Sequence, residues 1–78
     1  MFRYFIKYYD DTPKALIRLK IDHDTQTIVD QYWNASLTHW KDGEYGMAEI
    51  MRGSTNTVET SEHEAQRIFP NAPWNQDA

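Results

Sequence analysis

Three histidines and several carboxylates are the residues of this chain whose chemistry is suited to metal binding. His23, His39 and His63 do not follow the short spacings of zinc-binding motifs. The stretch Asp22-His23-Asp24 resembles the start of a calcium-binding loop, but the glycine and the closing glutamate of such a loop are missing. We interpret this stretch as a solvated turn, and we predict no metal site and no bound cofactor.

Common catalytic motifs are also missing from the sequence. There is no cysteine, no glycine-rich phosphate-binding loop and no serine nucleophile elbow. Acids such as Glu49 and Glu59 could act as an acid and a base, but a chance pair of this kind is expected in a chain with 12 acidic residues. A domain this short has little room for a closed pocket of roughly 300 Å³ or more. We predict that the protein is not an enzyme.

Aromatic and basic side chains alternate near the N-terminus, and this pattern is typical of binding surfaces. The period-2 alternation of residues 2–10 predicts a strand, one face of which carries Arg3, Phe5, Lys7 and Tyr9. Arg18 and Lys20 of the next strand are expected to lie alongside. Such a face is either covered by another element of the chain or binds a partner.

Two kinds of partner suit these six candidate residues. We expect a small non-enzymatic protein-interaction module that binds another protein, or a second copy of itself, through the aromatic and basic face of the N-terminal hairpin. The alternative is a single-stranded nucleic-acid-binding module, in which rings stack on bases and cations contact phosphates. The net charge of −4 opposes the alternative, because nucleic-acid binding is largely electrostatic.

Charge is distributed unevenly along the chain. Residues 1–20 hold five basic and two acidic side chains, whereas residues 21–78 hold three basic and ten acidic ones. The simpler interpretation is internal complementarity, in which a basic sheet edge lies near an acidic helix. The other interpretation is a basic patch that meets an acidic partner.

Three strands are expected in the first half of the chain, over residues 2–9, 14–21 and 27–33. Turns should join them at Asp10–Pro13 and Asp22–Thr25, since aspartate and proline favour turns and Pro13 should not lie inside a central strand. In the third strand we favour Val29 and Trp33 as the inward residues. The other register would bury the carboxylate of Asp30, which is costlier to bury than the amide of Gln31.

The second half is expected to form a short edge strand and two helices. Residues 37–40 suit the strand, and residues 44–52 suit a helix with Asp42 as its N-cap and Gly53 at its end. Residues 54–57 should form a loop. Ser61 and Glu64 fit a capping box, which predicts a helix over residues 62–69 that stops before Pro70.

These elements predict an α+β domain over residues 1–70, a three- to four-stranded antiparallel β-meander packed against a short helix and a C-terminal helix. Residues 71–78 should form a flexible tail, in which Trp74 could fold back onto the body of the domain. The chain contains neither a secretory signal pattern nor a long apolar run, and with no cysteine it is expected in the cytoplasm.

The order of the sequence features resembles a group of small uncharacterised actinobacterial proteins. The features are the aromatic first strand, Asp10-Asp11-Thr12-Pro13, Ala15-Leu16-Ile17-Arg18, Tyr32-Trp33, Trp40, Gly53 and Val58 to Ala65. The resemblance spans residues 4–68. It implies an intracellular bacterial protein, and it brings no assigned activity or functional residues.

Overall fold

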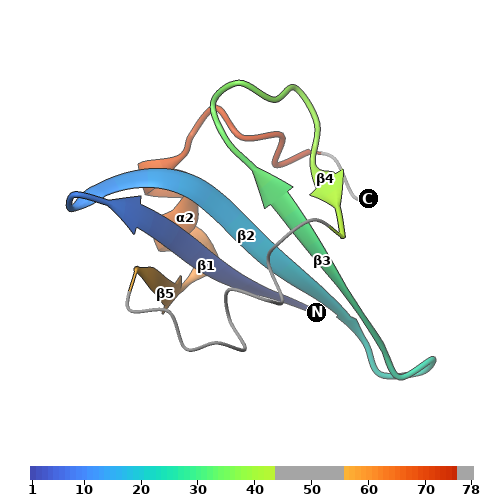
Figure 1. Ribbon diagram of the computed structural model, residues 1–78. Coiled ribbons are helices and arrows are strands. Elements are labelled where there is room, and N and C mark those ends of the chain that lie inside the picture. The colour runs from blue at the N-terminus through green and yellow to red at the C-terminus, as the bar shows by residue number, and fades with distance from the viewer. Residues whose placement is uncertain (44–55, 76–78) are drawn as a thin grey trace.

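The computed structural model describes residues 1–43 and 56–75. They form a five-stranded antiparallel sheet and one short α-helix (Figure 1). The elements are β1 (Phe2–Tyr9), β2 (Thr12–Asp22), β3 (Thr27–Trp33), β4 (Lys41–Asp42), β5 (Thr57–Thr60) and α2 (Glu62–Ile68). The strands are ordered β4-β3-β2-β1-β5 across the sheet. No helix among these residues is long and apolar enough to cross a membrane.

The hairpin between β1 and β2 is tighter than the sequence suggests. Asp10 and Asp11 alone form its turn, with φ of 49° and 61°, the left-handed backbone that two-residue hairpin turns use to match the strand twist. Pro13 therefore lies within β2, contrary to the prediction. It is accommodated because the pairing shifts between Lys7 and Tyr8, as in a β-bulge, and because β3 pairs with β2 only from Leu16 onward.

The register of β3 is the one favoured above. Trp33 lies opposite Leu16 and Gln31 lies opposite Arg18, and Gln31 and Trp33 are both buried. Val29 shares their face but is exposed near the end of the hairpin. The amide of Gln31 can satisfy two partners inside the protein, which explains why it, rather than the carboxylate of Asp30, occupies the buried position.

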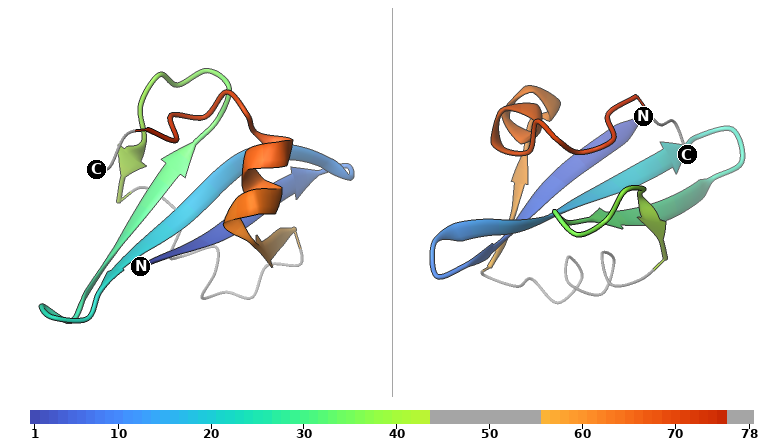
Figure 2. Two further views of the ribbon diagram at one scale, coloured as in Figure 1. Left: turned by 180° about the vertical axis from the view of Figure 1, so that it is seen from behind. Right: turned by 90° about the horizontal axis from the view of Figure 1, so that it is seen from above.

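The main core lies on the face of the sheet that α2 covers. In both views of Figure 2, α2 and the segment after it lie on the same side of the strands. Tyr4, Ile6 and Leu16 from the central strands meet Ala65 of the helix there. Aromatic side chains fill much of the remaining space, namely Trp33, Trp40, Phe69 and Trp74. On the opposite face lies a smaller buried cluster, Phe5, Ile17 and Leu19.

Two strands differ from the sequence prediction. The fourth strand is Lys41–Asp42 rather than 37–40, because Leu37 bonds back to Asn34 in a turn and Trp40 enters the core. β5 takes in Thr57, which was expected to be in a loop. It pairs with β1, a partner far away in the sequence that a local pattern cannot reveal.

The helix α2 starts where the capping signal places it. Ser61 is its N-cap and its Oγ accepts a hydrogen bond from the amide of Glu64 at 3.1 Å. The carboxylate of Glu64 pairs with Arg67, instead of completing the capping box. The other predicted helix, over 44–52 with its end at Gly53, lies outside the described residues. Its expected cap, Asp42, is in β4 and accepts a hydrogen bond from Gln31.

The segment after α2 packs on the domain as far as the structure describes it. Ala72 is buried, and the indole of Trp74 donates to the carbonyl of Phe69 at 2.8 Å. Trp40 donates in turn to the carbonyl of Pro73 at 3.0 Å. Aromatic contacts thus hold this segment on the core as far as Trp74.

Candidate interaction surface

The six candidate binding residues do not share one face of the sheet. Cross-strand partners point to the same side, and β1 pairs with β2 so that Arg3 lies opposite Leu19 and Phe5 opposite Ile17. Arg18 lies opposite Tyr4, and Lys20 opposite Phe2. Arg18 and Lys20 are therefore on the face covered by α2, and the expectation that they lie alongside Phe5 and Tyr9 is wrong.

The face that carries Arg3, Phe5, Lys7 and Tyr9 is largely occupied within the chain. Phe5 is buried in the cluster with Ile17 and Leu19, and Lys7 is partly buried. Tyr9 at the end of the hairpin is 69% exposed. Phe5 is therefore covered by the chain itself. The ring of Tyr9, by contrast, is accessible to a partner.

The cation of Arg3 is matched by an acid of the same chain. Its Nε and Nη2 atoms donate to the two carboxylate oxygens of Glu59 at 2.8 and 2.6 Å. The hydrogen bond from Arg3 holds the pKa of Glu59 below its usual value, and the same bond raises the pKa of Arg3. This ion pair joins β1 to β5, so the charge of Arg3 is balanced within the sheet rather than by an acidic helix.

Arg18 is enclosed in the main core. Its guanidinium carbon lies 4.5 Å from the centre of the Phe2 ring and 4.0 Å from that of Trp40. Its Nε donates to Gln31 Oε1 at 2.6 Å. The charge is stabilised by ring faces and an amide, and it cannot touch a partner without unfolding the core.

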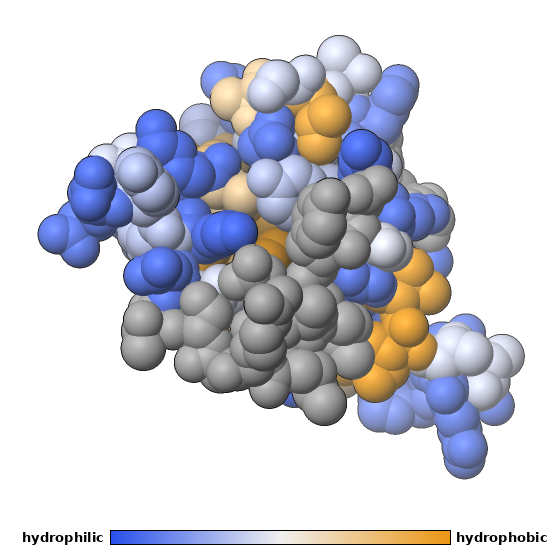
Figure 3. All heavy atoms as spheres, viewed as in Figure 1, coloured by the Kyte–Doolittle hydropathy of each residue, from blue (hydrophilic) through white to orange (hydrophobic). Residues whose placement is uncertain are grey.

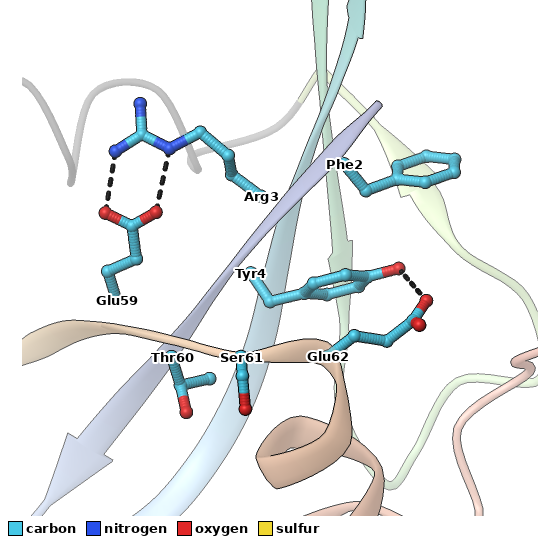
Figure 4. Close-up of a pocket in the computed structure, with 7 residues that line it drawn as sticks. All are labelled: Phe2, Arg3, Tyr4, Glu59, Thr60, Ser61 and Glu62. Carbon is cyan, nitrogen blue, oxygen red and sulfur yellow. Dashed lines mark hydrogen bonds and ion pairs between the residues drawn. The ribbon is translucent and has the colours of Figure 1, made fainter.

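A hollow of about 310 Å³ lies beside the start of β1, and Figure 4 shows its lining. Arg3 points toward Glu59 on one side, and the hydroxyl of Tyr4 donates to Glu62 at 3.0 Å on the other. Burial, and next the hydrogen bond to Glu62, raises the pKa of Tyr4 to about 12. These groups bond to one another and tie β5 and α2 to β1. Their arrangement fits a structural role.

The described histidines and carboxylates do not converge. Within residues 1–43 and 56–75, no group of three or more His, Cys, Asp or Glu side chains is placed to hold a metal ion. Asp22 instead stabilises its own turn, accepting hydrogen bonds from the amides of Asp24 and Thr25 at 3.0 and 3.3 Å. These bonds, first that from Thr25, lower the pKa of Asp22.

The outer edge of β3 is a surface that the sequence analysis did not identify. β4 pairs with β3 at Gln31 and Tyr32 alone, and no strand in the described parts of the chain pairs with Thr27–Val29 on the side away from β2. Ile28 is 52% exposed and Val29 is 41% exposed. Figure 3 shows apolar atoms at the surface along this end of the sheet, next to the polar tip of the hairpin.

The backbone of Ile28 points outward at this edge. The carbonyl of Asp30 accepts a hydrogen bond from the amide of Gly43, at 2.8 Å, on the β4 side. Backbone groups of alternate residues in an antiparallel strand point to the same side. The N–H and C=O of Ile28 therefore face away from β2, where an additional strand would bond.

The sequence contains a signal for this edge. Thr27, Ile28 and Val29 are consecutive β-branched residues directly after the turn that joins β2 to β3, so the strand is apolar on both faces at its start. Beside Val29, on the side of the sheet that carries α2, is an open hollow of about 280 Å³. Its lining is Lys20, Asp22, Thr27, Val29, Gln31 and Asp42.

Comparisons with protein-family models, with curated proteins and with solved structures find no match to this chain. The resemblance to small actinobacterial proteins therefore stays a prediction. Function has to be inferred from the geometry of the surfaces described above.

Proposed function

We propose that this protein is a small, non-enzymatic protein-interaction module that binds through the open edge of β3. The observation that supports this most directly is the exposure of Ile28 and Val29 on opposite faces of a strand segment that no described strand pairs with on its outer side. A strand added at this edge would bury both side chains and bond to the backbone of Ile28.

The residue types at this edge support the same proposal. Soluble proteins usually protect an edge strand with charged residues, proline or a bulge. The segment Thr27–Val29 has none of these. By contrast, the outer strand at the other side of the sheet, β5, carries Glu59. An edge left apolar while its counterpart is charged is suited to pairing with another chain.

A protein partner fits better than a single-stranded nucleic acid. The nucleic-acid alternative needs stacked aromatic rings beside accessible cations. Phe5 is buried, Arg3 is paired with Glu59 and Arg18 is enclosed in the core. The β3 edge itself offers apolar β-branched side chains, which suit a strand of another protein. We place the module in the cytoplasm, since a chain without cysteine is compatible with a reducing compartment.

Site-specific cross-linking tests this proposal. A photoreactive amino acid at position 28 is compared with the same amino acid at Val58, which is 51% exposed on β5. In cells that make the protein, we expect protein adducts from position 28 and far fewer from position 58. Equal labelling from both positions, or adducts with nucleic acid alone, would contradict the proposal.

A further inference from the structure

We infer that the partner at the β3 edge is a second copy of this chain, paired antiparallel through Thr27–Val29 about a two-fold axis at Ile28. The inference rests on the proposed function, for which it names the partner. Two facts support it: the direction of the Ile28 backbone and the self-complementary sequence of the edge.

The backbone directions select this register. Only residues with outward N–H and C=O groups can bond to an added strand, and in the exposed segment that residue is Ile28. A two-fold axis there makes each Ile28 donate to and accept from the other. It also places Thr27 opposite Val29 of the second copy. The two copies would then share one continuous sheet with an isologous contact.

One face of the joined sheet becomes a row of isoleucines. Ile21 lies opposite Ile28 in the hairpin of β2 and β3. The two-fold axis puts the Ile28 side chains of both copies opposite each other, at about 4.5–5.5 Å between Cβ atoms. Four isoleucines then cross four adjacent strands, and the 52% exposed Ile28 becomes covered on its open side.

The side chains on the other face of the sheet are equally compatible with pairing of two copies. There, Val29 of each copy packs against Thr27 of the other, and both residues line the open hollow of about 280 Å³. Beyond this segment the carbonyl of Asp30 is already bonded to the amide of Gly43, so the new ladder is confined to Thr27–Val29, where no two charged residues lie opposite each other.

The edge of β5 is not self-complementary in this way. Ile6 faces Val58 across the β1–β5 ladder, and Tyr8 donates to the carbonyl of Asn56, so the outward backbone groups of β5 belong to Thr57 and Glu59. A two-fold axis at Glu59 would place two carboxylates opposite each other. Self-pairing is therefore favoured at β3, and Val58 provides a matched control position.

Introduced cysteines test the register directly, because the natural chain has none. Thr27→Cys and Val29→Cys proteins are purified separately, then mixed and oxidised by a glutathione pair. The antiparallel register predicts that the mixed 27–29 disulfide dominates over both homodimers, since only that pair is directly opposite. Homodimers formed as readily as the mixed product would overturn the register.

Sedimentation of the purified chain tests the association itself. We expect a weak dimer that forms with rising protein concentration between the micromolar and millimolar ranges. Ile28→Lys should abolish it by placing two lysines opposite each other, whereas Val58→Lys should preserve it. Both positions are about half exposed, and we therefore expect both variants to fold. Thermal midpoints equal to that of the natural chain would show that neither substitution disturbs the fold. A dimer that survives Ile28→Lys would overturn the inference.

The two proposals fail in distinguishable ways. If the purified chain stays monomeric and forms no 27–29 disulfide, while position 28 cross-links to a different protein in cells, the partner is not a second copy and the interaction module stands. If position 28 yields no protein adduct and the chain stays monomeric, both proposals fail.

Discussion

Arg18 and Gln31 lie opposite each other on β2 and β3, and Arg18 Nε donates to Gln31 Oε1 at 2.6 Å. Each of the two side chains is only 2% exposed. Gln31 also bonds toward the edge of the sheet, where its Nε2 donates to Asp42 Oδ1 at 2.8 Å. A buried cation is thus linked through an amide to a carboxylate at the edge of the sheet.

Arg18→Ala should lower the free energy of unfolding by roughly 3–5 kcal/mol, because it leaves a cavity between Phe2 and Trp40 and an amide oxygen without its donor. Urea unfolding measures this. Lys14→Ala in the same strand is the control, since an exposed side chain should change stability by less than about 0.5 kcal/mol. If Arg18→Ala lowers the free energy of unfolding no more than Lys14→Ala does, the contacts of Arg18 with the two rings do not stabilise the fold.

Phe5→Ala and Tyr9→Ala should differ strongly, although both residues occupy the same face of β1. Phe5 is 5% exposed, so its truncation should cost about 3–5 kcal/mol of stability and can unfold so small a domain. Tyr9 is largely exposed, and its truncation should change stability by less than about 1 kcal/mol. Thermal unfolding of the two variants side by side checks this. Equal destabilisation would mean that Tyr9 is also core.

Stability should fall in strong alkali because of Tyr4. Its pKa is raised from 10.0 to about 12 in the folded protein, so the folded state holds the proton more tightly than the unfolded state. The stabilisation is fully present below pH 10 and is lost as the pH rises through about 12. Tyr4→Phe should flatten the curve of unfolding free energy against pH in this window. An unchanged slope in the variant would assign the effect to other groups.

The ion pair of Arg3 and Glu59 should weaken in acid. Arg3 lowers the pKa of Glu59 below 4.5, so the pair stabilises the fold above that pH and the contribution is lost as the pH falls through the lowered value. A double-mutant cycle with Arg3→Ala and Glu59→Ala should give a favourable coupling at neutral pH. The coupling should decline with acid and with salt, because both side chains are nearly half exposed. Coupling that is constant with pH would contradict this assignment.

Ser61→Ala should lower stability by about 0.5–2 kcal/mol, since it removes the acceptor for the amide of Glu64 at the start of α2. Gln66→Ala on the exposed side of the same helix is the control, and it should have little effect because alanine favours helix. Chemical unfolding midpoints compare the two variants. No loss for Ser61→Ala would mean that the cap does not support the helix.

Local sequence patterns predicted the parts of this fold that depend on neighbouring residues. Alternation located the first three strands, and the spacing of Ser61 and Glu64 located the start of α2. The register of β3 followed from the relative cost of burying Asp30 or Gln31. Predictions failed where distant segments meet, as in β5, which pairs with β1, and in Arg18, which the pairing of β1 with β2 places on the face away from Phe5.

By itself, the sequence determined which residues alternate, where turns form and where a helix begins, because backbone preferences and capping act over a few positions. Only the tertiary structure decided that Arg3 and Arg18 lie on opposite faces and which edge stays open among the residues that the structure describes. The pairing of β1 with β2 turned Arg18 into the core and away from Phe5, and the short β4 left Ile28 at an exposed edge. The physical reason is that register and strand order depend on contacts between residues far apart in the chain.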